Sequence, residues 1–157
     1  MVHPMSSASS RFSDFSADPQ LAQIKLPPHS LEAEQSLIGG ILLDNQAWER
    51  VADLVNEADF YRDDHRRIYR HITKLIDQGR PADAVTVFES LEKNGEAEQA
   101  GGLAYIAELA NNTPSAANIR RYAEIVRERA ILRKLVAVGD EIAASALSPS
   151  GKDAKAL

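Results

Sequence analysis

The side chains best suited to metal binding or acid–base chemistry are four histidines and a few closely spaced acidic residues, in a chain of 157 residues without cysteine. His65 and His71 are six residues apart, so a helix would place them on different faces, and a zinc site requires a more specific spacing. Glu32 and Glu34 also diverge. We therefore expect surface or helix-packing roles for both histidines, and we assign no metal ligand and no catalytic residue. A Ser–His–Asp set assembles in space, so that alternative stays open.

Gly151-Lys152 resembles the end of a Walker A loop, which binds the phosphates of a nucleotide. That loop requires glycine five positions before its second glycine, and serine or threonine directly after its lysine. Ala146 and Asp153 occupy these positions. We therefore expect that this chain binds no nucleotide in this way, is not an enzyme by itself and carries no cofactor.

A basic stretch at 118–134 is the most prominent charge feature. Its net charge is +4, whereas the whole chain carries −5. The stretch could be a solvated helix face with internal pairs such as Glu124–Arg127, a contact for an acidic protein, or a contact for a nucleic-acid backbone. A charge run without interleaved aromatic residues is weak evidence for nucleic acid, so a helical nucleic-acid-binding module is the alternative function. The basic residues are Arg120, Arg121, Arg127, Arg129, Arg133 and Lys134.

Residues 113–147 are predicted to place this charge on one long helix. Thr113, which precedes a proline, or Asn118 can cap it. Residues 119–147 contain no proline and a single glycine, Gly139, and as a helix they would be about 45 Å long. A globule of about 120 residues has a radius of gyration of only about 14 Å. Either the helix breaks near Gly139 or its far half leaves the globule.

An apolar stripe runs along the far half of this helix. Its four residues recur at i, i+4, i+7 and i+11, which places them on one face. An apolar stripe on a projecting helix requires a partner, so the pattern predicts helix-to-helix assembly, with Arg129 and Arg133 near the rim of the interface. The stripe residues are Ile131, Leu135, Val138 and Ile142.

Residues 26–112 are predicted to form a compact globule of five or six short helices, which makes the fold all-α. Ser30 can cap the first helix, and Gly39-Gly40 in its middle costs about 1 kcal/mol per glycine relative to alanine. Close approach of a neighbouring helix would offset that cost, whereas a phosphate-binding glycine turn would need a preceding strand. The later helices are expected to begin at Asp44-Asn45, at Asp63 or Asp64, at a Thr86–Glu89 capping box and after Gly101-Gly102.

Residues 1–25 are rich in serine and poor in apolar periodicity, so we expect a disordered tail. No apolar run approaches the roughly 18 residues that a membrane span requires, and the N-terminus lacks a hydrophobic signal core. These features predict a cytoplasmic protein with no membrane partner.

Four blocks of the sequence are long enough to compare with known families. They are 26–45 (LPPHSLEAEQSLIGGILLDN), 59–69 (DFYRDDHRRIY), 101–109 (GGLAYIAEL) and 112–134 (NTPSAANIRRYAEIVRERAILRK). In order and at the expected spacings, these blocks resemble the N-terminal domain of the bacterial replicative DNA helicase, the DnaB family. The resemblance covers about 26–157, and the last block is the closest match.

This resemblance implies a helical globule followed by a protruding helical hairpin over 113–157, whose second helix would begin near 152–157. In the family these domains pair through their hairpins, and three pairs form a collar on the hexamer that also docks primase, a DnaG-type enzyme. The implied partners are therefore copies of this chain and primase. ATP, Mg²⁺ and most DNA contacts would belong to an ATPase domain outside this chain, in a parent protein that is an ATP-driven helicase in DNA replication.

Overall fold

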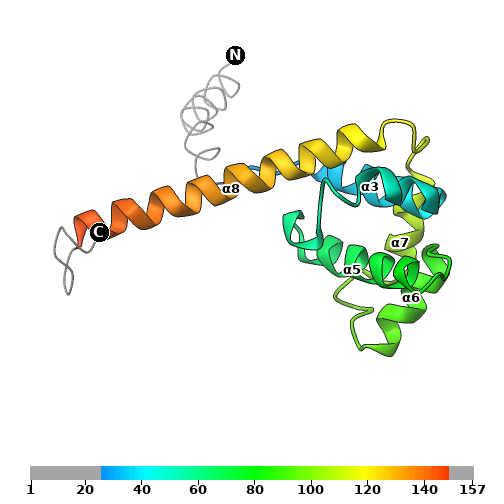
Figure 1. The fold of residues 1–157 in the computed structure, drawn as a ribbon. Coiled ribbons are helices and arrows are strands. Elements are labelled where there is room, and N and C mark those ends of the chain that lie inside the picture. The colour runs from blue at the N-terminus through cyan, green and yellow to red at the C-terminus, as the bar shows by residue number, and fades with distance from the viewer. Residues whose placement is uncertain (1–25, 149–157) are drawn as a thin grey trace, which may run out of the picture.

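The computed structural model describes residues 26–148, and over this range the secondary structure is helical without any strand. Figure 1 shows a globule of short helices from which one long helix projects. The all-α prediction is confirmed. The predicted tail at 1–25 and the predicted hairpin start at 152–157 lie outside the described residues. The elements are α3 (Leu31–Leu43), η1 (Asn45–Ala47), α4 (Trp48–Val51), η2 (Glu57–Asp59), α5 (Asp63–Asp77), α6 (Ala84–Lys93), α7 (Gly102–Asn111) and α8 (Ile119–Leu147).

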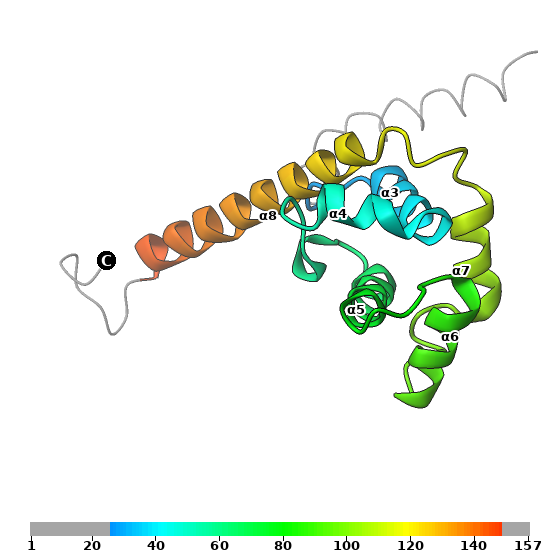
Figure 2. The ribbon, with the colours of Figure 1, turned by 45° about the vertical axis from the view of Figure 1, so that its right-hand side comes forward.

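The core is built around α3, which contacts α8, α7 and α5 (Figure 2). Leu37, Ile38 and Ile41 of α3 are completely buried, because the helical period places them on the sides that face these neighbours. The first turns of α8 close the core with Ile119, Ala123 and Val126. None of the described helices combines the length and the hydropathy that a membrane span would need.

The caps of the first helices follow from local sequence. The Ser30 hydroxyl accepts a hydrogen bond from the Ala33 N–H at 3.2 Å and begins α3 as predicted. The start of α6 differs from the prediction. Asp83 accepts from the Thr86 N–H at 2.8 Å and donates its own N–H to the Thr86 hydroxyl at 2.9 Å, so the capping box begins at Asp83 and not at Thr86.

Of the two predicted caps of the long helix, the structure places Asn118 at the N-cap position, because α8 begins at Ile119 and not after Thr113. Thr113 is buried, and its hydroxyl donates to the Leu109 carbonyl at 3.0 Å. Thr113 therefore donates a hydrogen bond to a backbone carbonyl near the C-terminus of α7 and does not cap α8. The helix continues without a break through Gly139, and Figure 1 shows its far half leaving the globule, as the second of the two alternatives required.

Gly39 and Gly40 lie where α3 meets the end of α7 and the start of α8. A Cβ atom at Gly39 would lie 2.0 Å from Thr113 Oγ1 and 2.2 Å from the Leu109 carbonyl oxygen. A Cβ at Gly40 would lie 3.0 Å from Ile119 Cδ1. Any side chain at Gly39 would therefore overlap its neighbours, and the glycine allows the two segments to approach this closely.

Candidate assembly interface

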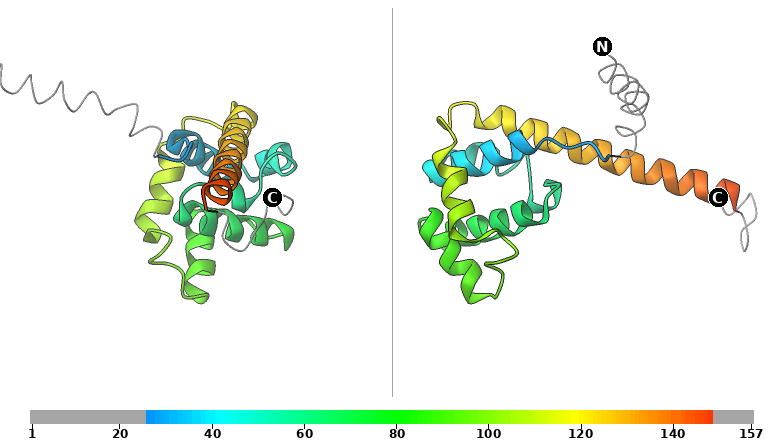
Figure 3. Two further views of the ribbon diagram at one scale, coloured as in Figure 1. Left: turned by 90° about the vertical axis from the view of Figure 1, so that its left-hand side faces the viewer. Right: turned by 180° about the vertical axis from the view of Figure 1, so that it is seen from behind.

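The near and far halves of α8 have different surroundings. Val126 is the last fully buried residue of the helix, with 1% of its surface exposed. Beyond it the helix extends past the globule, as the right-hand view in Figure 3 shows. The far half therefore presents most of its circumference to solvent.

The four stripe residues are all exposed on this far half. The exposed fractions are 45% for Ile131, 63% for Leu135, 51% for Val138 and 65% for Ile142. The structure thus places the predicted residues together on one solvent-facing stripe of α8, of which only Ile131 lies beside the globule, at the hollow that Ala58 and Asp59 line.

A second apolar stripe, which the sequence analysis missed, lies beside the first. Leu132 is 44% exposed, Val136 is 46% exposed, and Leu147 near the helix end is 85% exposed. At about 100° per residue, the two stripes together span about half of the helix circumference, centred opposite the buried Ile119–Val126 face. The signal was present in the sequence as the i, i+4 pair Leu132–Val136. An apolar arc this wide exceeds what one narrow helix–helix seam covers.

The basic residues of α8 do not form one free positive face. Arg120 and Arg121 pair with Glu124 at 3.9 and 3.3 Å. Arg127 pairs with Asp59 at 3.0 Å, in place of the expected Glu124 pair. Within residues 26–148, Arg129 makes no hydrogen bond or ion pair.

Arg133 points toward the globule. Its Nη1 donates to the Pro28 carbonyl at 2.8 Å and its Nη2 donates to the Asp59 carbonyl at 2.6 Å. Its guanidinium carbon also lies 5.5 Å from the centre of the Tyr61 ring. Arg133 therefore sits at the junction between α8 and the globule, away from the first stripe and next to the edge of the second, three residues before Val136.

Both internal histidines take helix-packing roles, which sequence reasoning left as one of two options. His65 is fully buried, with Nδ1 at 2.8 Å from Glu34 Oε1 and Nε2 at 2.7 Å from the Tyr105 hydroxyl. His71 is 1% exposed and lies between the Ser90 hydroxyl at 2.7 Å and Glu96 Oε2 at 2.9 Å. Across the described residues, no group of three or more potential ligands is placed to hold a metal ion.

The His71–Glu96 contact predicts how stability depends on pH. The hydrogen bond from His71, together with Arg67, lowers the pKa of Glu96 below its ordinary value of 4.5. A carboxyl group with a lowered pKa stabilises the fold above its unfolded-state pKa, and that contribution is lost as the pH falls through the lowered value. We expect the urea concentration at the unfolding midpoint to decrease as the pH is lowered below about 4.5. In the Glu96→Gln variant the midpoint should depend less on pH. The two midpoint curves should converge in acid, and parallel curves would contradict this assignment.

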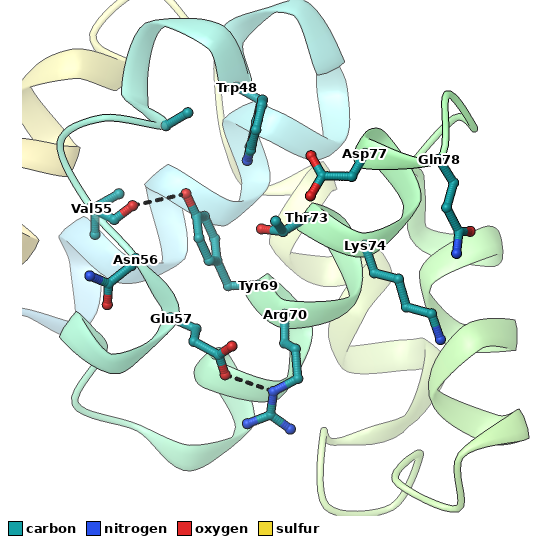
Figure 4. Close-up of a pocket in the computed structure, with 11 residues that line it drawn as sticks. Trp48, Val55, Asn56, Glu57, Tyr69, Arg70, Thr73, Lys74, Asp77 and Gln78 are labelled. Carbon is teal, nitrogen blue, oxygen red and sulfur yellow. Dashed lines mark hydrogen bonds and ion pairs between the residues drawn. The ribbon is translucent and has the colours of Figure 1, made fainter.

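A hollow of about 520 Å³ lies between α4 and α5 (Figure 4). Two buried polar atoms there, Trp48 Nε1 and Thr73 Oγ1, have no hydrogen-bond partner. The Tyr69 hydroxyl donates to the Val55 carbonyl at 3.4 Å, and burial raises the pKa of Tyr69 to about 12. A phenol with this pKa is a poor acid or base near neutral pH. No nucleophile next to a general base lines this hollow, and we assign it no chemistry.

Comparisons with known proteins agree on one family. The family profile described as "DnaB-like helicase N terminal domain" matches residues 26–128. The replicative DNA helicase DnaB of Haemophilus influenzae is 47% identical over 142 residues, which are 90% of this chain and 30% of that protein. The corresponding protein of Geobacillus stearothermophilus is 38% identical over 124 residues, which are 79% of this chain and 27% of that protein.

A solved structure shows the same arrangement of helices. The crystal structure of the N-terminal domain of DnaB helicase from Mycobacterium tuberculosis superposes with a TM-score of 0.78 at 40% sequence identity. The match covers 82% of this chain and 90% of that chain. In contrast, the chain spans only about 30% of the length of the full curated relatives that it matches.

Proposed function

Because the chain belongs to the family of DnaB-like helicase N-terminal domains, we propose that it is the assembly and partner-binding domain of a replicative DNA helicase. In this proposal α8 joins copies of the chain in pairs, and three pairs form a collar on a hexamer that docks primase. The domain is non-catalytic. ATP and Mg²⁺ would bind in an ATPase domain outside this chain, which would also make most DNA contacts, and the protein would act in the cytoplasm.

The observation that carries this proposal is the exposed apolar arc of α8. Soluble monomers rarely expose contiguous apolar patches of this kind, and burying them against a partner releases about 25 cal/mol per Å². The interface would consist of the stripe Ile131, Leu135, Val138 and Ile142, with Arg129 at its rim. The neighbouring stripe at Leu132 and Val136 would accept the second helix of a hairpin.

Two charges placed in the stripe test the proposal. The wild-type chain is expected to show a mass of two or more chains by light scattering across a concentration range. Leu135→Asp combined with Ile142→Asp should reduce it to one chain, because two carboxylates would be buried without partners. Far-UV circular dichroism should remain helical, since neither side chain contributes to the core.

A matched control uses an equally exposed apolar residue on the globule. Val85 is 65% exposed on α6, away from α8, so Val85→Asp should leave the mass unchanged. Assembly that survives the double substitution would mean that the stripe is not the interface. A wild-type mass of one chain at the highest concentration would contradict assembly through α8.

The alternative, a nucleic-acid-binding module that uses 118–134, receives less support from the side-chain contacts. Arg120, Arg121 and Arg127 pair with carboxylates, and Arg133 donates to backbone carbonyls. Titration with forked DNA at two salt concentrations separates the cases, because binding through phosphate contacts weakens steeply with salt.

A further inference from the structure

We propose that Arg133, supported by the Arg127–Asp59 pair, is the positioning residue that sets the direction in which α8 leaves the globule. We refer to Arg127, Arg133, Asp59 and Pro28 as the α8 clamp. This role deepens the proposed function, because α8 carries the proposed interface and its direction decides where that interface points.

Apolar packing of α8 against the globule ends at the near edge of the clamp, directly before Arg127. The buried apolar contacts of the helix end at Val126, and Ala130 one turn later is only partly buried. Between this part of α8 and the Ala58–Asp59 turn lies an open hollow of about 380 Å³, which Arg127 and Arg133 also line. Because side chains do not fill this space, the polar contacts of the two arginines are the connections across it.

Arg133 is chemically suited to fixing a direction. A guanidinium group is planar and presents several donors in a rigid fork, so two simultaneous hydrogen bonds define its orientation. Its two acceptors, the carbonyls of Pro28 and Asp59, belong to segments that are 105 and 74 residues away in sequence. Contact with the Tyr61 ring at 5.5 Å adds a third constraint. A lysine or glutamine could not reproduce this set of contacts.

Asp59 and Tyr61, two of the groups that Arg133 contacts, are themselves bonded to the core and to neighbouring segments. Asp59 is 5% exposed, and its Oδ2 accepts from the Asn56 N–H at 2.9 Å in a capping box, while Oδ1 accepts from Arg127 at 3.0 Å. The Tyr61 N–H donates to the buried Glu34 at 2.7 Å, and its ring stacks on His29 at a centroid distance of 4.2 Å. The clamp therefore connects α8 to the core and not to a loosely held loop.

A small change at the clamp would be amplified along the helix. From Arg133 to Leu147 the helix rises about 21 Å, so a tilt of about 10° would move its end by about 4 Å. A displacement of that size exceeds what close packing between two apolar surfaces tolerates. The clamp thus determines whether the apolar arcs of two copies can meet in register.

Distances between two spin labels test this role. The chain has no cysteine, so cysteines introduced at the exposed positions Lys93 on α6 and Glu141 on α8 can be labelled selectively. Dilution with an excess of unlabelled chain ensures that double electron–electron resonance reports intrachain distances only. Arg133→Gln is expected to shift and broaden the distance distribution. Arg127→Gln, whose side chain is half exposed, should produce a smaller change of the same kind.

Arg129→Gln is the matched control, because Arg129 lies on the same helix and makes no hydrogen bond or ion pair within residues 26–148. Its distribution should superpose on that of the wild type. An unchanged distribution for Arg133→Gln would overturn the proposal. Loss of cooperative unfolding in Arg133→Gln would also overturn it, since Arg133 would then be a stability residue. The spin-label distances within one chain do not depend on assembly. If light scattering showed that the stripe is not the interface, the distances would still test the role of Arg133.

Discussion

Gly39→Ala is expected to destabilise the domain by about 3 kcal/mol or more, the upper part of the range for overpacking a core. The added Cβ would lie 2.0 Å from Thr113 Oγ1 and 2.2 Å from the Leu109 carbonyl oxygen. The second neighbour is backbone, so relief requires α3 and α7 to separate. Urea unfolding measures the loss, followed by circular dichroism and by the fluorescence of Trp48, the single tryptophan.

Gly139→Ala provides the matched control for this prediction. Gly139 is also a helical glycine, but a Cβ there would meet no atom within 4 Å. Alanine favours a helix by about 1 kcal/mol over glycine, so this variant should be more stable than the wild type. If both variants gained stability, the close approach of α3 to Thr113 would be wrong.

The Gly39-Gly40 pair shows what the sequence could and could not predict. Gly39-Gly40 in a helical pattern indicates a close neighbour, because the propensity cost requires some compensation. The identity of that neighbour depends on tertiary packing. Thr113 followed by proline has the local pattern of a helix cap, yet the structure buries Thr113 under α3 and begins α8 at Ile119. Local rules therefore allowed both Thr113 and Asn118 as the cap, and only the tertiary packing of Thr113 decides for Asn118.

The projecting surface was predictable because it depends on local periodicity alone. The spacing of Leu135 and Ile142 places them on one face whatever the globule does. The same periodicity also contains Leu132 and Val136, whose i, i+4 spacing places them on an adjoining face of the helix. The role of Arg133 was not predictable, since its partners lie 74 and 105 residues away in the sequence. The sequence around an arginine on a helix surface does not indicate which distant backbone carbonyl it will bind.

Glu34 is the clearest residue whose contacts the local sequence does not indicate. Its position in the first turn of α3 fits an ordinary acidic residue near the positive end of the helix dipole. The structure instead buries it to 1% exposure, where it accepts hydrogen bonds from the Tyr61 N–H and contacts His65. The chain from Glu34 through His65 to the Tyr105 hydroxyl links α3, α5 and α7.

Glu34→Ala is accordingly expected to lower the free energy of unfolding by about 2–6 kcal/mol, because two buried donors lose their acceptor and each unsatisfied group costs about 1–3 kcal/mol. The substitution leaves the Tyr61 N–H and His65 Nδ1 without their partner, and both are held away from water. Because Tyr61 supports the contact of Arg133 with the globule, the spin-label distance to α8 should broaden in this variant as well. Urea unfolding measures the free energy of unfolding, and double electron–electron resonance measures the distance distribution.

Two further substitutions separate the contribution of the buried network to stability from that of the helix dipole. Glu32→Ala removes an exposed acid from the same first turn, so it should cost about 0.3–1 kcal/mol through the dipole alone. Glu34→Gln keeps the shape, and its amide can still accept from the Tyr61 N–H while donating to His65 in its other tautomer. The free energy of unfolding that Glu34→Gln loses should fall between the losses of Glu32→Ala and Glu34→Ala. Equal losses for Glu32→Ala and Glu34→Ala would show that the helix dipole, and not the network joining α3, α5 and α7, accounts for the effect of Glu34.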